Sequence, residues 1–142
     1  MATRFQVTFD CADPELLAAF WAGALGYILQ PPPQGYDAWE DWLREMGIPE
    51  EEWSSRAAAV DPEGVGPRLW FQMVPEGKTA KNRVHLDLNV ATAGQPEARP
   101  MLVDAEVERL VGLGALRLRA TEELGAYWVV MEDPEGNEFC VQ

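Results

Sequence analysis

The sequence predicts an α+β fold in which two tandem βαβββ modules, residues 1–77 and 78–142, form the half-open barrel of a single domain. Several short segments alternate apolar and polar residues, which is typical of strands with one buried face. Two other segments carry apolar residues at helical spacing. The order strand, helix, three strands occurs twice, and the turn sequence Asp-Pro-Glu-Gly recurs at residues 61–64 and 133–136. Such a repeat supports the assignment of each unit by the other.

The first module opens with a strand over residues 5–11, where every second residue is apolar. A helix follows, because Asp13 suits an N-cap, Pro14 suits the first helical position and an apolar stripe runs on to Leu25. Gly26 is placed to end this helix in a left-handed cap. The remaining strands of this module are predicted over residues 27–29, 56–60 and 68–74.

Residues 36–55 differ in character from the rest of the module and are interpreted as a helical insertion over the main scaffold. Trp39, Trp42 and Met46 recur there at helical spacing among acidic residues, and Trp53 follows in a second short turn. Two roles are open for these tryptophans. They either cap a pocket or only hold the insertion in place.

The second module opens on residues 84–90, a predicted strand that contains the only histidine of the chain, His85. Its polar positions present an imidazole, a carboxylate (Asp87) and an amide (Asn89) on one face. A helix follows, marked by apolar residues from Val103 to Val111. The last strands are predicted over residues 116–120, 126–131 and 138–142.

Alternation divides the strand residues into two faces. The apolar face, expected to meet the helices, contains Phe5, Val7, Phe9, Leu69, Phe71, Met73, Leu86, Leu88, Val90, Phe139 and Val141. The other face contains Gln6, Thr8, Asp10, Trp70, Gln72, Val74, His85, Asp87, Asn89, Glu138, Cys140 and Gln142. Such a polar face either meets bulk water or lines a cup for a small organic molecule. Agreement among four strands favours the cup.

Composition excludes several classes of function. A net charge of −13, from 24 acidic and 11 basic residues, argues against binding to nucleic acid or to an anionic membrane. No signal peptide, membrane-spanning run or zinc-ribbon pattern is present, so a cytoplasmic protein with reduced thiols at Cys11 and Cys140 is expected. Cys11 shares its face with Phe9 and is expected in the core.

Several motifs carry a resemblance to a known family. They are the Asp13-Pro14 helix start, Leu25-Gly26-Tyr27, the two Asp-Pro-Glu-Gly turns and the segments 81–88 and 133–140. On these motifs the chain resembles the glyoxalase-like domains of the vicinal oxygen chelate superfamily, which groups glyoxalases, bleomycin-resistance proteins and dioxygenases. The resemblance covers nearly the whole chain except residues 36–55. It implies the paired-module fold, and often a homodimer, but a shared fold does not fix a reaction.

In that superfamily a divalent metal is held by the first and last strands of the two halves. The resemblance places the ligands on Gln6, Gln72, His85 and Cys140, with zinc, nickel or manganese as the expected ion. The family's glutamate position falls on Cys140, so this set lacks the carboxylate that hard ions prefer, although Glu138 or Asp87 would supply one. The alternative is a metal-free pocket in which His85 hydrogen-bonds Asp87 or Gln6.

The polar face and the family resemblance together favour two functions. The first is a metal-free or weakly metallated protein that binds a small molecule, as sequestering antibiotic-resistance relatives do, with contacts from Trp70, Gln72, Asp87 and Trp128. The alternative is a metal-dependent lyase or isomerase acting on a small carbonyl or enediolate-forming substrate, with Glu138 or Asp87 moving the proton. A Cys140 nucleophile with His85 as its base is a third, narrower hypothesis.

Overall fold

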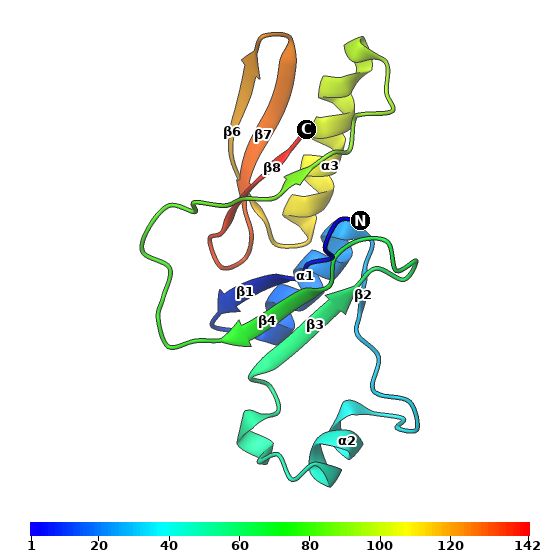
Figure 1. Cartoon of the computed structure of the whole chain (residues 1–142). Coiled ribbons are helices and arrows are strands. Elements are labelled where there is room, and N and C mark those ends of the chain that lie inside the picture. The colour runs from blue at the N-terminus through cyan, green and yellow to red at the C-terminus, as the bar shows by residue number, and fades with distance from the viewer. The chain divides into compact units, whose positions relative to one another are not determined.

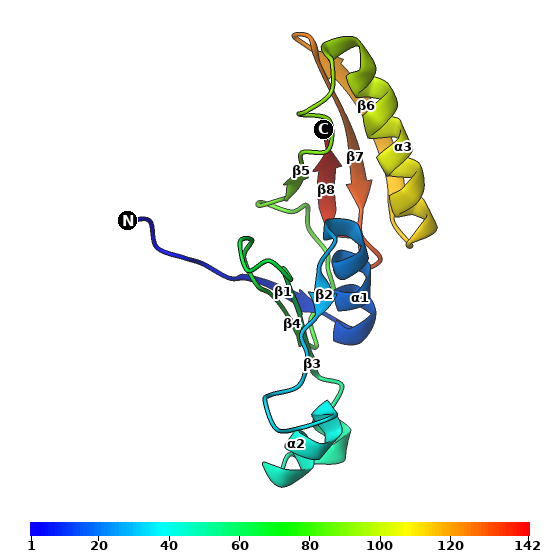
Figure 2. The ribbon, with the colours of Figure 1, turned by 90° about the vertical axis from the view of Figure 1, so that its right-hand side faces the viewer.

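The computed structural model describes residues 1–142, and it divides the chain into two compact units, Met1–Gly77 and Lys78–Gln142. We call them module one and module two. Each is a four-stranded mixed sheet with one long helix on one face (Figures 1 and 2). The predicted α+β class and the repeated βαβββ order are confirmed.

Module one contains β1 (Val7–Cys11), α1 (Pro14–Leu25), β2 (Ile28–Leu29), α2 (Trp39–Glu45), β3 (Arg56–Val60) and β4 (Leu69–Met73), with a 3-10 turn at Glu50–Glu52. The strand order is β1-β4-β3-β2, and β1 runs parallel to β4. The predicted helix ends are confirmed. The Asp13 side chain accepts a hydrogen bond from the Leu16 backbone N–H, and Gly26 closes α1 with φ of 69°.

Module two contains β5 (Asp87–Leu88), α3 (Arg99–Gly112), β6 (Leu116–Glu123), β7 (Ala126–Glu132) and β8 (Glu138–Val141), with a 3-10 turn at Pro96–Ala98. Its strand order, β5-β8-β7-β6, repeats that of module one, and β5 runs parallel to β8. None of the helices is long and apolar enough to cross a membrane.

The apolar face of each sheet is buried against its own helix. In module one, the ring of Phe9 stacks on Phe71 at 5.1 Å between centroids and lies 5.3 Å from Trp21 of α1. Burying such rings is the main stabilising contribution to a small sheet-and-helix unit. The fully buried residues of module two are Val103, Val107, Leu110, Val129, Met131, Phe139 and Val141. Cys11 is buried, as predicted.

The predicted edge strands are too long. The strand expected over residues 84–90 is regular only at Asp87–Leu88, and Val84 is 80% exposed. The strand expected from Phe5 begins at Val7, with Phe5 70% exposed. The cause for β5 is its partner, because β5 pairs only with β8, which has four residues. Met73, assigned to the helix side, is 49% exposed at the end of β4.

The insertion lies beyond the start of β3 instead of over the sheet, which corrects the expectation that it covers the scaffold (Figures 1 and 2). Its tryptophans contact the insertion and its entry. Trp39 donates to the Gln30 carbonyl at 2.8 Å, Trp53 donates to the Ile48 carbonyl at 2.9 Å, and Trp39 meets Trp42 edge to face. These contacts favour the second of the two roles, that of holding the insertion together.

The repeated turn has the same hydrogen bonds in both modules. The backbone N–H of Gly64 donates to the Asp61 carbonyl at 3.0 Å, and that of Gly136 donates to the Asp133 carbonyl at 2.9 Å. Each aspartate side chain also accepts from the backbone two residues later. This is the Asx-turn chemistry that favours aspartate at the first position.

Candidate functional site

The candidate site lies on the face of the module-two sheet that points away from α3. Strand alternation puts Leu88, Val129 and Val141 on the helix side and their neighbours on the open side. The register then aligns one open-face residue from each strand, namely Asp87, Cys140, Val130 and Arg119. The edge strand β5 thus places its polar residues beside those of β8.

Three of the predicted polar residues come together on this face. Nδ1 of His85 lies 2.8 Å from Oδ1 of Asp87, and one ligand atom each from His85, Asp87 and Cys140 lie within 4.8 Å of one another. A carboxylate has only acceptors, so the Nδ1 atom of His85 donates to Asp87, and the Cys140 thiol lies within 4.8 Å of both residues. We call these three residues the module-two cluster.

The environment of Cys140 keeps its thiol protonated. Burial raises its pKa most, and the charge of Asp87 and the hydrogen bond to it raise the pKa further. Arg119 and Lys81 act in the opposite direction. Because the thiolate is the reactive form of cysteine, this arrangement opposes the hypothesis of a Cys140 nucleophile at neutral pH.

Glu138 is held apart from the cluster. Its carboxylate accepts a hydrogen bond from the Asn82 backbone N–H at 2.9 Å and lies 3.5 Å from Nζ of Lys78. The Asn82 hydrogen bond is the main cause that lowers the pKa of Glu138, and Lys78 adds to it. A carboxylate with a lowered pKa is a weaker base, so the predicted role of Glu138 in moving a proton stays a prediction that this geometry does not favour.

In module one, Gln6 and Gln72 are not brought together. Gln72 lies opposite Asp10 and donates to its carboxylate at 2.8 Å, whereas Gln6 accepts at 2.8 Å from Arg68 before β1 begins. The two amides are thus four positions apart along β1, roughly 13 Å at the usual strand rise. Each amide is engaged by a neighbour within its own module.

The register also shows which residues of the two modules correspond. Gln72 donates to Asp10 at 2.8 Å, and Gln142 donates to Asn89 at the same distance. Trp70 pairs with Thr8 as Cys140 pairs with Asp87. The counterpart of Cys140 in module one is therefore Trp70. The family resemblance instead implies Gln72 and Cys140 as the last-strand ligands of the two halves, and Gln72 lies two residues beyond the position that the register matches with Cys140.

The aromatic residues expected to contact a ligand have different environments. Trp70 lies under the Arg68 guanidinium, 4.7 Å from the ring centroid, and Arg68 also donates to Gln30 at 2.6 Å. Trp128 lies two residues before Val130, on the open face of β7, and is half-buried. Arg68 was not singled out from the sequence, because a basic residue before a strand carries no signal of cation–π stacking.

The donor set of the module-two cluster fits a borderline metal ion. Imidazole nitrogen, carboxylate oxygen and thiolate sulfur are the ligand types of zinc, and three protein ligands are the usual number in its catalytic sites. Two members, His85 and Cys140, belong to the set that the family resemblance implies, and Asp87 supplies the carboxylate that the set lacked. Binding a metal would require the Cys140 proton to leave.

The fold defines the class of protein to which the chain belongs. Two βαβββ modules with this strand order form the fold of the glyoxalase/bleomycin-resistance/dioxygenase group. The family model for the glyoxalase-like domain matches residues 6–142, so the chain belongs to that family.

Solved structures share this fold at low sequence identity. A glyoxalase/bleomycin resistance protein/dioxygenase family enzyme from Burkholderia phytofirmans is 18% identical, with a TM-score of 0.61 over 96% of this chain and 94% of that one. The fosfomycin resistance protein FosX from Listeria monocytogenes, complexed with Mn(II) and 1S,2S-dihydroxypropylphosphonic acid, is 12% identical, with a TM-score of 0.63 over 100% and 90%. No curated protein matches the chain.

Proposed function

We propose that this protein binds a small organic molecule on the open face of module two, against His85, Asp87 and Cys140, and that it does so without a tightly held metal. The single observation that carries the proposal is the cluster itself, in which Asp87 accepts from His85 at 2.8 Å and lies within 4.8 Å of the Cys140 sulfur. The raised pKa of the Cys140 thiol opposes the loss of its proton that metal binding would require. A neutral His85 ring that donates from Nδ1 keeps Nε2 as an acceptor for a ligand donor.

Two further features support small-molecule binding. Trp128 offers an aromatic surface on the same face, and aromatic rings beside a few placed polar groups are typical of ligand sites. A structural neighbour, FosX, is described in complex with a small phosphonic acid and Mn(II). Within the proposal, Asp87 and Trp128 contact the ligand, while Trp70 and Gln72 form the corresponding face of module one.

A second candidate function is a metal-dependent lyase or isomerase, and the observation that favours it is the approach of three unlike ligand atoms to within 4.8 Å. A divalent metal on His85, Asp87 and Cys140 would supply Lewis-acid polarisation of a substrate carbonyl. Asp87 would then be a ligand, which leaves Glu138 as the remaining predicted carboxylate for the proton.

Metal analysis separates these two candidates. Protein purified without chelator is expected to contain no stoichiometric zinc, nickel or manganese and to keep its melting temperature in chelator. Stoichiometric metal that is lost in His85→Ala, with Gln95→Ala as a control on the loop after β5, would instead establish the second candidate.

Ligand binding itself is tested by NMR on 15N-labelled protein titrated with a library of small organic acids, amines and carbonyl compounds. At least one compound is expected to shift the signals of the His85 ring and the Cys140 amide, and His85→Ala is expected to weaken that compound's binding. A library that shifts no signal on this face would overturn the proposal. The homodimer and the cytoplasmic location remain predictions, and light scattering after size-exclusion chromatography tests the first.

A further inference from the structure

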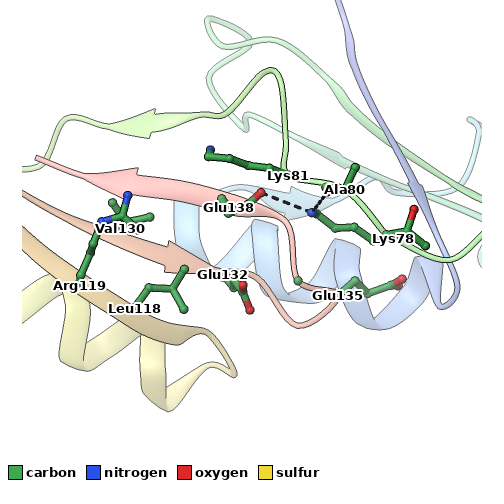
Figure 3. A pocket seen from close by; sticks show the side chains of 11 residues that line it. Lys78, Ala80, Lys81, Leu118, Arg119, Val130, Glu132, Glu135 and Glu138 are labelled. Atoms are coloured by element: carbon green, nitrogen blue, oxygen red, sulfur yellow. Dashed lines mark hydrogen bonds and ion pairs between the residues drawn. The ribbon is translucent and has the colours of Figure 1, made fainter.

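Module two contains an open pocket of about 540 Å³ beside the cluster. It is formed by the segment before β5, the start of β8, the open face of β6 and β7, and the Asp-Pro-Glu-Gly turn (Figure 3). Its lining residues are Lys78, Thr79, Ala80, Lys81, Leu118, Arg119, Val130, Glu132, Glu135, Gly136 and Glu138. Six of these eleven carry a charge, three of each sign.

Only part of this charge is neutralised within the chain. Lys78 and Glu138 form an ion pair, and Glu138 also accepts from the Asn82 backbone. Lys81 and Arg119 make no ion pair or hydrogen bond with a carboxylate. Figure 3 shows Arg119 beside Val130 and Lys81 on the segment before β5, across β8 from them. Arg119 lies in the row of Val130 and Cys140, which also contains Asp87, so Lys81 and Arg119 together exceed the one carboxylate of this row.

The next row of the same face has an excess of negative charge. Glu132 lies directly opposite Glu138 on the antiparallel strands β7 and β8. Like charges in this position destabilise a sheet. Lys78 neutralises Glu138, but Glu132 takes part in no ion pair. A cation from outside the chain would offset the charge that remains.

The distance between the two rows indicates how far apart the charged ends of a ligand would lie. Val130 and Glu132 are two residues apart on one strand, so the rows are about 7 Å apart. The carboxylate and the ammonium group of an α-amino acid are separated by a single carbon, which is too short for this spacing. Three or four carbons suit it, and the apolar side chains of Leu118 and Val130 line the pocket beside such a chain.

We propose that this pocket binds a small zwitterion whose carboxylate lies between Lys81 and Arg119 and whose ammonium group, three or four carbons away, lies against Glu132. The inference rests on the proposed function, because it names the class of ligand for the same sheet face. The ligand would extend from the cluster row towards the repeated turn.

NMR titration with four probes tests the proposal, using 15N-labelled protein. The probes are 4-aminobutanoate, butanoate, butylamine and glycine. We expect 4-aminobutanoate to bind most tightly and to shift the amides of Lys81, Arg119 and Glu132. Losing one charged contact in an open pocket is expected to weaken binding by up to about fivefold, so butanoate, butylamine and glycine should each show a higher Kd.

Charge-neutralising variants assign each end of the ligand. Arg119→Gln is expected to raise the Kd of 4-aminobutanoate towards that of butylamine, with Lys81 keeping part of the carboxylate contact. Glu132→Gln is expected to bring the Kd close to that of butanoate. Arg117→Gln is the matched control, because Arg117 pairs with buried Met131 and so belongs to the opposite face of β6. It is expected to leave the Kd unchanged.

Several results would overturn the inference. Butanoate binding as tightly as 4-aminobutanoate would show that the acidic end contributes nothing, and an equal loss in Arg117→Gln would show only general charge attraction. If no probe binds but another compound of the organic library shifts the His85 ring, the zwitterion assignment is wrong and the proposed function stands. If no compound of either set shifts this face, both are wrong.

Discussion

Replacing Asp133 by alanine is expected to destabilise module two, because this carboxylate organises the turn between β7 and β8. The residue is only 3% exposed. Its side chain accepts hydrogen bonds from the backbone N–H of Glu135 at 2.9 Å, the backbone N–H of Asn137 at 3.0 Å and the Asn137 amide at 2.9 Å. The same turn carries Glu135 and Glu138 into the pocket.

The magnitude follows from these three donors. A net intramolecular hydrogen bond contributes about 1 kcal/mol, and donors left without an acceptor cost at least as much. Losing the acceptor for three donors therefore predicts a loss of about 3 kcal/mol in the free energy of unfolding. Asp133→Asn keeps one side-chain oxygen as an acceptor and is expected to lose roughly half of that amount.

Urea unfolding followed by tryptophan fluorescence measures this loss. Trp128 is the only tryptophan of module two, so a variant in which the other five are replaced by phenylalanine reports on that module alone. With a slope near 1.5 kcal/mol/M, the midpoint is expected to fall by about 2 M. Asp61→Ala, in the partly exposed duplicate turn, is expected to cost less, because water can replace the carboxylate there. A loss below about 0.5 kcal/mol for Asp133→Ala would refute this reasoning.

Three further predictions concern the end of α1, the thiol of Cys140 and the carboxylate of Glu138. Gly26→Ala is expected to lower the free energy of unfolding in urea by about 1 kcal/mol, because φ at Gly26 is 69°. Gly112→Ala is expected to cause no such loss, because φ there is ordinary, and equal losses in the two variants would contradict this reasoning. Asp87→Asn is expected to speed alkylation of Cys140 by iodoacetamide at a fixed pH, because the carboxylate helps burial to raise the thiol pKa; peptide mass spectrometry measures the rate, and an unchanged rate counts against the cluster. Glu138 has a lowered folded-state pKa, so its contribution to stability is full above the unfolded pKa of about 4.3 and disappears as the pH falls through the folded value. Urea midpoints should therefore fall less between pH 7 and pH 3 for Glu138→Gln than for the original chain, and parallel curves would disprove this linkage.

Features that are determined by neighbouring residues were predicted correctly from the sequence. The Asp13 cap, the Gly26 terminator and the repeated turn depend on short-range hydrogen bonds and on backbone conformation, and the structure confirms all three. The strand predicted over residues 56–60 also has its observed bounds, Arg56–Val60. These features are visible in the sequence because each is determined within a few residues.

Features that depend on a partner strand were predicted less well. The length of β5 is set by β8, some 50 residues later, and alternation over residues 84–90 carries no information about that limit. The same holds for side-chain pairs. The sequence placed Gln72 and His85 on open faces, but only the register shows that Gln72 meets Asp10 and that Asp87 lies beside Cys140.

The pocket was not predicted from the sequence for a related reason. Lys81 was interpreted as part of a basic connector, and Arg119 as part of an alternating strand. They line one pocket because the segment before β5 crosses the start of β8, where Asn82 donates to Glu138 at 2.9 Å. That contact joins positions 56 residues apart, and no local pattern encodes it.

The state of the imidazole ring is the most direct test of the module-two cluster. His85 is the only histidine, so its two ring nitrogens give unambiguous signals in a long-range 1H–15N NMR spectrum. The account predicts that the neutral ring carries its proton on Nδ1, donated to Asp87, and that Asp87→Asn alters this preference. A ring protonated on Nε2 and unaffected by Asp87→Asn would contradict the cluster and remove the basis of the proposed binding site.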